Sequence, residues 1–354
     1  MATNPPEPPP AALRLQIDRD ALAANWRTLD RLSGASRAGA AVKADAYGVG
    51  ARIAVPVLRD AGCRDFFVTY SSEAADLLDL VPPGEVALLH GPLTAADAAW
   101  ARATGVRPVI NTLAQAQRWM ETGGGLCDVM VDTGINRLGL AMAELGEEVV
   151  RRLEIDVLHS HLASAEEPVT LNRVQRERWD QARGALPHRR AALANSAGIA
   201  LGPDYHGDVT RPGLALFGGV PCAALAGQIR QVVRPMAAIM QVRTIGAGET
   251  VGYNATFTAD RTMRVGVVAL GYADGYLRAW SGGKGAFLAQ GQRLPVLGRV
   301  SMDMTVIDLG ETPAIVEGDW VEAEYSLPQA AAASGLSQYE LLTLLADRFD
   351  RPAL

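Results

Sequence analysis

The sequence predicts an α/β protein, a (β/α)8 TIM barrel followed by a mostly β C-terminal domain. Two observations predict the barrel. Short, continuous apolar runs recur at even spacing through the first two thirds of the 354 residues, and segments of helical composition lie between them. A third observation predicts the second domain, because after about residue 223 short β-type runs punctuated by Gly, Pro and Asp replace this alternation. Eight strands that alternate with helices favour a closed parallel barrel.

The predicted barrel strands are mostly continuous apolar runs, which are typical of strands buried on both faces of a parallel sheet. We expect these strands at residues 39–43, 65–70, 85–90, 107–111, 127–132, 155–160, 191–195 and 208–217. Segments rich in Ala, Leu and Arg predict helices between them, among others at residues 51–61, 72–80, 95–104, 113–122, 144–153 and 171–186.

Three parts of the chain follow from these patterns. Residues 1–11 form a disordered, proline-rich tail, residues 12–223 the barrel, and residues 224–354 the β-rich domain. In the β-rich domain we expect strands within residues 236–245, 263–270, 286–290, 296–309 and 320–325, and no long helical segment before residues 337–348. The alternating segment 13–17 can pair with either domain.

Composition excludes several classes of function. The net charge of −6 argues against a nucleic-acid or anionic-membrane surface, and no apolar run is long enough to span a membrane. The N-terminus lacks the charged and apolar regions of a signal peptide. Three widely spaced cysteines without a C-x-x-C motif indicate neither a disulfide framework nor a metal site, and they suit the reducing cytoplasm.

Polar residues follow the predicted barrel strands, at the face where barrel enzymes place their active sites. They are Lys43, His90, Asn111, Asp132 with nearby Arg137, His161, Asn195 with Ser196, and Arg211. Lys43 is the most informative, because a lysine that ends a buried strand must be paired, neutralised or covalently used. An amine with a lowered pKa is what attachment to an aldehyde cofactor requires. By position alone, a lysine that merely reaches solvent is an equally good interpretation.

The residues around Lys43 favour the cofactor. Residues 41–48, AVKADAYG, closely resemble the cofactor-lysine motif of the alanine racemase family. Seven further segments resemble motifs of that family in the family's order: 131–139 VDTGINRLG, 160–163 SHLA, 194–197 ANSA, 211–218 RPGLALFG, 251–253 VGY, 271–275 GYADG and 298–303 GRVSMD. The resemblance covers nearly the whole chain after the tail.

The resemblance implies racemisation of L- and D-alanine with pyridoxal phosphate. Lys43 would hold the cofactor and act as one acid/base, and Tyr253 of the partner subunit would be the other. The active unit would then be a homodimer with shared sites. Racemisation removes a proton from one face of a planar carbanion and returns it on the other, and two groups on opposite faces achieve this without moving. Without the family, Tyr253 reads as an aromatic residue in a β turn.

Further roles follow from the resemblance. Arg211 would face the pyridine nitrogen, which must then accept a hydrogen bond because arginine only donates. This weakens the electron sink and limits side reactions such as transamination. His161 would lie near the cofactor ring and Arg211, and a nearby fixed cation favours the neutral imidazole. His159, in alternation with His161, shares its face and packs beside it.

The remaining site residues bind cofactor and substrate. The phosphate would be held by Tyr47, Ser196, the amides around Gly213 and Leu214, and Tyr339, and Asn195 belongs to the same cofactor-binding set. Arg137 and the Met302 backbone of the partner subunit would contact the substrate carboxylate. Supporting positions are Tyr272, Arg278, Arg299 and Asp303.

The sequence departs from the family at several positions. Met130 stands where many members have a modified lysine that orients the substrate arginine, so Arg137 must be held in another way. Val49 replaces a frequent histidine, Glu166 a common aspartate, and Ser337 a common apolar residue. These changes bear on the breadth of the substrate range more than on the type of reaction.

Other functions on the same barrel type fit the sequence less well. A decarboxylase of the same barrel type requires an acidic residue where Arg211 stands, and a D-threonine aldolase requires a metal site for which no His/Cys cluster follows His206. A non-catalytic pyridoxal-phosphate carrier lacks the β domain. A serine or broad-specificity racemase stays open, as does the choice between D-alanine supply for peptidoglycan and alanine catabolism.

Overall fold

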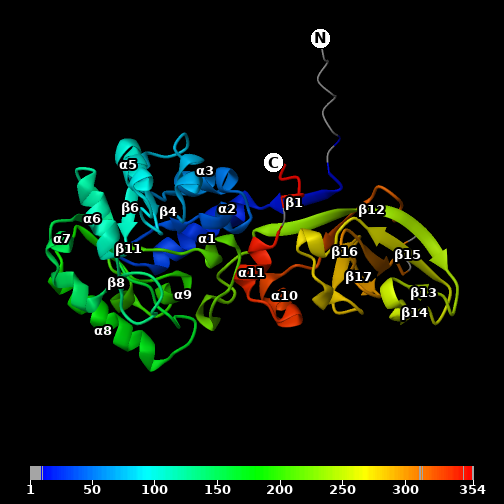
Figure 1. Cartoon of the computed structure of the whole chain (residues 1–354). Helices are drawn as coiled ribbons and strands as arrows, with labels where there is room; N and C mark the ends of the chain where they lie inside the picture. Colours follow the sequence, from blue (N-terminus) through cyan, green and yellow to red (C-terminus); the bar gives the residue numbers. More distant parts are fainter. Residues whose placement is uncertain (1–8, 10, 311, 313, 346, 353–354) are drawn as a thin grey trace, which may run out of the picture. The chain divides into compact units, whose positions relative to one another are not determined.

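The computed structural model describes residues 9, 11–310, 312, 314–345 and 347–352, and most of the predicted tail lies outside these residues. The chain divides into two compact units (Figure 1). One unit is Arg19–Arg230. The other combines the chain from Gln231 onward with the segment that ends at Asp18.

The first unit is built on parallel strands in the order β10-β9-β7-β6-β5-β4-β3, with β8 beside β7 and β11 paired to β2. Their bounds are β2 Arg37–Ala38, β3 Ala40–Ala41, β4 Phe66–Val68, β5 Val86–Leu88, β6 Arg107–Ile110, β7 Leu126–Asp132, β8 Leu140–Ala141, β9 Glu154–His159, β10 Arg190–Ala192 and β11 Val209–Thr210.

Backbone hydrogen bonds close these strands into a barrel. Next to β11, the Arg211 amide donates to the Ala194 carbonyl at 2.8 Å, and the Ala41 amide of β3 donates to the Pro212 carbonyl at 2.8 Å. The β11 segment therefore joins β3 to the chain just after β10. This closure confirms the predicted barrel. The second half of the predicted strand 208–217 is wrong, because after Pro212, which has no N–H, the chain enters a 3-10 helix over Leu214–Phe217.

Helices and shorter helical segments lie outside these strands or at their ends (Figure 1). They are α1 Arg19–Leu32, α2 Lys43–Tyr47, α3 Ala51–Ala61, α4 Ser71–Ala75, α5 Ala95–Thr104, α6 Leu113–Glu121, α7 Glu148–Arg151, α8 Thr170–Ala185 and α9 Ser196–Ile199. Helix α1 buries Leu22, Trp26 and Leu29, spaced as one face of a helix, and the Trp26 indole donates to the Ala38 carbonyl at 3.2 Å. This contact fixes α1 against β2.

The second unit is an antiparallel sheet in the order β1-β12-β15-β18-β17-β16-β19, and β19 also pairs with β12. The bounds are β1 Leu13–Ile17, β12 Val233–Ile245, β13 Thr250–Val251, β14 Phe257–Thr258, β15 Met263–Val268, β16 Ala286–Ala289, β17 Gln292–Leu297, β18 Thr305–Asp308 and β19 Trp320–Ala323. The predicted β-rich domain is confirmed. Strand β1 pairs with β12, which settles the open choice for the alternating N-terminal segment.

Two helices end this unit, α10 Leu327–Ser334 and α11 Gln338–Thr343. The sequence prediction missed α10 and made α11 too long. Gly335 ends α10 with a φ of 76°, and the Ser337 hydroxyl accepts from the Glu340 amide at 3.2 Å to begin α11. Within the described residues, no helix combines the length and the apolar character needed to cross a bilayer.

Candidate active site

Lys43 lies where β3 ends and α2 begins, at the face formed by the C-terminal ends of the strands. Its side chain is half-buried. Burial and the nearby Arg137 cation lower the pKa of the Lys43 amine, while the Glu73 carboxylate partly opposes them. A larger fraction of this amine is therefore neutral and nucleophilic at physiological pH than for an ordinary lysine.

The four residues after Lys43, from Ala44 to Tyr47, form a left-handed turn with φ between 51° and 59°. Residues other than glycine rarely adopt this conformation. Two carboxylates hold it: Glu73 accepts from the Ala44 amide at 2.7 Å, and Asp45 accepts from the Ala51 amide at 2.6 Å. The turn places the motif of the sequence analysis in one fixed loop at the barrel mouth.

A cradle of backbone amides lies between the seventh and eighth barrel strands. The Ser196 hydroxyl accepts from the amides of Gly213 and Ala215 at 3.0 and 3.2 Å, and the Asn195 side chain caps α9 by accepting from the Gly198 amide at 2.8 Å. A Cβ at Gly213 would lie only 2.2 Å from the Tyr47 hydroxyl oxygen. Only glycine allows this approach of backbone to phenol.

Tyr47 is buried beside this cradle, and its ring packs on Phe217 with centroids 5.1 Å apart. Burial raises the pKa of the Tyr47 hydroxyl to about 12. The phenol therefore keeps its proton and can donate to an anion. Of the predicted phosphate-binding set, the structure brings together Tyr47, Ser196 and the backbone at Gly213 and Leu214.

Arg211 is buried next to β11. Its guanidinium donates to the Ser160 carbonyl, to the Leu193 carbonyl at 3.3 Å and to Nδ1 of His159 at 3.3 Å. Burial lowers the pKa of Arg211 to about 10, against a smaller opposite effect of Asp128. Arg211 therefore stays a cation and a hydrogen-bond donor near neutral pH.

His161 is half-buried in the same region. Burial, and then the cations Arg211, Arg137 and Lys43, lower the pKa of His161 to about 3. The imidazole is neutral at physiological pH, as the sequence predicts.

Arg137 follows β7 in an exposed loop shaped by Asp132, whose carboxylate accepts from the amides of Gly134, Asn136 and Arg137. Met130, two residues before Asp132, is buried. Within the part of the chain that the structure describes, no hydrogen bond or ion pair to the Arg137 guanidinium is found.

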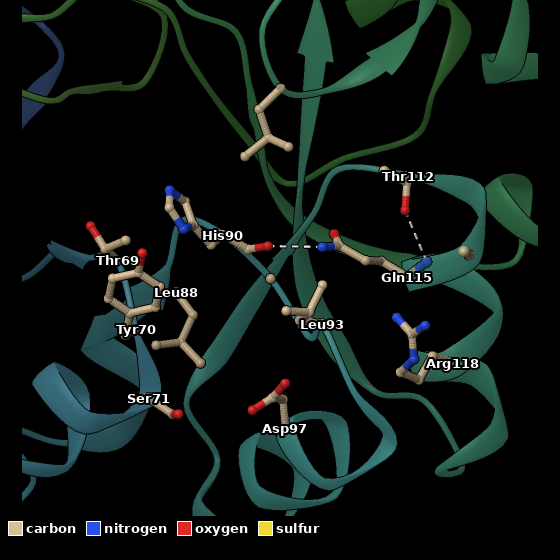
Figure 2. Close-up of a pocket in the computed structure, with 13 residues that line it drawn as sticks. Thr69, Tyr70, Ser71, Leu88, His90, Leu93, Asp97, Thr112, Gln115 and Arg118 are labelled. Carbon is tan, nitrogen blue, oxygen red and sulfur yellow. Dashed lines mark hydrogen bonds between the residues drawn. The ribbon is translucent and has the colours of Figure 1, made fainter.

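A pocket of about 550 Å³ opens at the ends of β4, β5 and β6 (Figure 2). The His90 ring packs edge-on to Tyr70 with centroids 5.1 Å apart, and the His90 carbonyl accepts from Gln115 Nε2 at 2.8 Å. Asn111, the next polar strand-end residue, is buried and donates to the carbonyls of Leu89 and Val109. His90 borders the pocket, whereas Asn111 supports the backbone beneath it.

The other predicted site residues lie in the second unit: Tyr253, Tyr272, Arg278, Arg299, Met302, Asp303 and Tyr339. Tyr253 and Met302 are exposed, at 63% and 53%. The Ala273 amide donates to the Met302 carbonyl at 3.0 Å, and the Arg278 guanidinium lies 5.1 Å from the Tyr272 ring centroid. The loops at Tyr272 and Met302 are therefore joined, and together they present exposed side chains.

Comparison with known proteins agrees with this architecture. The alanine racemase N-terminal domain model matches residues 17–221, and the C-terminal domain model matches residues 232–353. The chain belongs to the alanine racemase family. The predicted family is thereby confirmed.

Individual relatives match over nearly the whole chain. A biosynthetic alanine racemase of Agrobacterium fabrum is 38% identical, covering 97% of this chain and 94% of its own, and a catabolic one of the same organism is 39% identical, covering 96% and 92%. A crystal structure of alanine racemase from Bartonella henselae with covalently bound pyridoxal phosphate has a TM-score of 0.88 and 33% identity, covering 97% of this chain and 99% of its own.

The residues at the barrel mouth fit the cofactor predicted for the family. Lys43 offers an amine of lowered pKa for an aldehyde, and the absence of a Cβ at Gly213 lets the protonated Tyr47 hydroxyl lie against the backbone beside Ser196. Arg211 is a buried donor suited to an unprotonated ring nitrogen. The donor set therefore suits pyridoxal phosphate.

Sequence reasoning underestimated the residues behind Arg211. His159, expected only to pack, contacts Arg211 through Nδ1 and the Asp128 carboxylate through Nε2 at 3.1 Å. Glu73, which holds the turn after Lys43, was not singled out either. Asp128 did leave a signal, because a carboxylate in the middle of the apolar run 127–132 needs a buried partner.

Proposed function

We propose that the chain is a pyridoxal-phosphate-dependent alanine racemase in which Lys43 and Tyr253 are the two acid/base groups. Its membership of the family across both domains confirms the predicted activity, the enzyme class and the cofactor. The observation that carries the assignment of the site is the half-buried Lys43 amine of lowered pKa, at the barrel mouth beside the Ser196–Gly213 cradle.

The proposed roles follow from the chemistry of each side chain. When bound, pyridoxal phosphate supplies the electron sink that makes the Cα–H of alanine acidic. The Lys43 Nζ moves the proton on one face of Cα, and the Tyr253 hydroxyl moves it on the other. Arg211 donates to the ring nitrogen, and neutral His161 lies beside it without adding charge.

Binding is divided among the remaining residues. Tyr47, Ser196 and the backbone around Gly213 and Leu214 hold the phosphate, together with Asn195, which caps the helix that begins at Ser196. Arg137 and the Met302 backbone of the partner subunit bind the carboxylate of alanine. Supporting roles fall to Tyr272, Arg278, Arg299 and Asp303.

The proposed active unit is a homodimer in which Tyr253 and Met302 of the partner subunit complete each site. Their high exposure in the single chain leaves both side chains accessible to a partner, and tyrosine and methionine are residue types enriched at protein interfaces. Two symmetric interfaces then create two shared sites. Mixing inactive Lys43→Ala and Tyr253→Phe chains should restore activity through hybrid dimers with one intact site. If subunits exchange and no activity returns, the sites are not shared.

Isotope exchange tests the two-base assignment. Tyr253→Phe should keep the absorbance of the bound cofactor and lose most racemisation in both directions, because each direction needs both groups. In deuterium oxide it should still exchange the Cα proton of one enantiomer slowly, through Lys43 and with retention. Racemisation and exchange of both enantiomers at the parent rate would remove Tyr253 from the mechanism.

The cellular setting is proposed on separate grounds. Cys63, Cys127 and Cys222 are free thiols, and burial raises the pKa of the first two, which suits the reducing cytoplasm. The same reaction serves D-alanine supply for the cell wall or alanine catabolism, and relatives of both kinds are similarly close. Growth of a D-alanine auxotroph carrying this gene tests the first role, and a panel of L-amino acids tests the breadth of the substrate range.

A further inference from the structure

The barrel contains a cluster of charged side chains near the N-terminal ends of its strands. Its members, which we call the floor cluster, are Asp65, Arg107, Asp128, Asp156 and Arg190. The Arg107 guanidinium contacts all three carboxylates at N···O distances between 3.1 and 3.3 Å. Arg190 contacts Asp65 at 2.8 Å and Asp156 at 2.7 Å. Because β4 and β10 are not neighbours in the sheet, the contact between Asp65 and Arg190 crosses the barrel interior.

The floor cluster has an excess of negative charge. Three carboxylates face two guanidinium groups, so one negative charge is left without a cation of its own. Asp128 has the longest of the Arg107 contacts, at 3.3 Å, and its side chain is fully buried. A buried charge is strongly unfavourable unless it is compensated. One further cation would balance the charge of the cluster. Arg211 is such a cation, and it lies on the other side of His159 from Asp128.

His159 joins Asp128 to Arg211. The ring is fully buried, with Nε2 3.1 Å from an Asp128 carboxylate oxygen and Nδ1 3.3 Å from Nη1 of Arg211. Since the guanidinium can only donate, Nδ1 must accept, and Nε2 must then carry the proton and donate to Asp128. The two neighbours thus select one neutral tautomer. Burial also lowers the pKa of His159, in the direction of this neutral form.

We propose that His159 is a positioning residue for Arg211: as a neutral imidazole of fixed tautomer it connects the guanidinium to Asp128, and so to the floor cluster whose excess negative charge balances the Arg211 cation. The inference rests on the proposed function in one respect, namely that Arg211 donates to the ring nitrogen of the cofactor.

The arrangement fixes the direction of the guanidinium as well as its charge. Its described contacts use one N–H of Nη1 and the two of Nη2, so two N–H groups remain to donate to a ligand. The contact with His159 sets the plane in which these groups point. Loss of this contact lets the guanidinium turn, and loss of the Asp128 charge removes the compensation for keeping it buried.

The tautomer can be tested on the apoprotein, without any activity. Nitrogen-15 NMR of protein labelled at its five histidines should show one ring, lost in His159→Gln, with Nε2 protonated and Nδ1 unprotonated at pH 7. A protonated Nδ1, or an imidazolium, would overturn the proposal. This measurement needs the parent protein and His159→Gln, which assigns the signal, and no other variant.

Two substitutions separate the contact of His159 with Asp128 from its contact with Arg211 in the holoenzyme. His159→Asn keeps an acceptor near Nδ1 and loses the contact with Asp128, whereas His159→Gln keeps a donor near Nε2 and loses the contact with Arg211. We expect kcat for alanine racemisation to fall by about tenfold or more in His159→Gln, with a smaller change in KM and more transamination per racemisation. His159→Asn should retain more activity, and Asp128→Asn should raise transamination because the compensating charge is gone.

His206 provides the matched control. It is also buried, and its ring nitrogens contact the carbonyls of Ser33 and Ile199. His206→Gln should lower the melting temperature and leave kcat and transamination unchanged. The proposal fails if the parent racemises alanine and the His159 variants show a lower melting temperature with unchanged kcat and transamination, as expected for His206→Gln. His159 would then have a structural role alone. If the parent does not racemise alanine, the proposed function fails, and the NMR measurement still tests the tautomer of His159 between Asp128 and Arg211.

Discussion

Two buried arginines of the same barrel show opposite shifts in pKa. Burial alone would lower the pKa of Arg107 on the floor, but Asp128, Asp65 and Asp156 raise it above its ordinary value. At the mouth, burial lowers the pKa of Arg211, and Asp128 opposes this only in part. The charge of the floor arginine is compensated by three carboxylates of the protein, whereas the mouth arginine retains donors for a ligand. Compensation of charge thus separates the part of the barrel that supports the fold from the part that binds.

The mouth also holds the strained backbone. The left-handed turn after Lys43 and the cations Lys43, Arg137 and Arg211 lie where the strands end, and the nearby His161 stays neutral. Conformational strain and closely spaced cations of this kind persist where the surroundings hold them for function. If this contrast is correct, substitutions at the mouth should change activity more than stability, and substitutions on the floor should do the reverse.

The largest expected effect is that of Lys43→Ala. Racemisation should fall by about 10³-fold or more, because one acid/base and the attachment of the cofactor are lost together. The free energy of unfolding of the apoprotein should stay the same or rise, since a buried amine disappears. Polarimetry of alanine and urea unfolding measure the two quantities.

Lys284, the only other lysine, gives the control for this test. Lys284→Ala should keep full activity. Borohydride reduction of the parent followed by peptide mapping should find the pyridoxyl group on Lys43, and a label on Lys284 instead would move the site out of the barrel.

On the floor, Arg107→Met should mainly reduce stability. It leaves three buried carboxylates with a single guanidinium, and breaking a buried ion pair in this way costs about 3–5 kcal/mol of the free energy of unfolding. Arg293→Met, which removes an exposed pair with Glu324, should cost no more than about 1 kcal/mol. Equal losses for the two variants in urea unfolding would remove the distinction between floor and surface.

The pH dependence of stability tests the neutral histidine at the mouth. The ordinary pKa of His161 is 6.5, and in the folded chain it is about 3. Between these values the unfolded chain binds a proton that the folded chain does not, so stability falls as the pH drops below 6.5, by about 2 kcal/mol at pH 5. His161→Asn should lack this part of the loss when the apoprotein is unfolded in urea at pH 8 and pH 5. Identical acid sensitivity would mean that His161 is protonated in the folded chain.

The sequence predicted the mouth better than the floor for a physical reason. Residues such as Lys43, Ser196 and Arg211 follow apolar strands directly, and local patterns locate strand ends. The floor cluster joins Asp65, Arg107 and Asp156 across a closed barrel, and no local pattern encodes which distant strands meet. The same limit explains His159, whose partners Asp128 and Arg211 lie on other strands.

The open choice and the missed helix in the predicted fold had a similar origin. Strand β1 pairs with β12 far along the chain, which its own alternation could not reveal. Helix α10 was missed because its alanine-rich segment has a weak amphipathic pattern, and its boundary depends on Gly335 and Ser337. Only the family resemblance, and not periodicity, placed Tyr253 at a site.

The smallest expected effect concerns the strained turn and reverses the usual cost of glycine. Ala44 is exposed and has a φ of 51°, a conformation that costs a residue with a Cβ about 1–2 kcal/mol and costs glycine much less. Ala99 is exposed within helix α5, where glycine destabilises by about 0.8–1 kcal/mol. Ala99→Gly should therefore lower the free energy of unfolding, whereas Ala44→Gly should leave it unchanged or raise it by up to about 1 kcal/mol. Since relief of strain also loosens the loop that holds Lys43, Ala44→Gly should weaken cofactor binding while Ala99→Gly should not. If both variants lose stability equally, the turn after Lys43 is not strained, and the contrast between mouth and floor rests on charge alone.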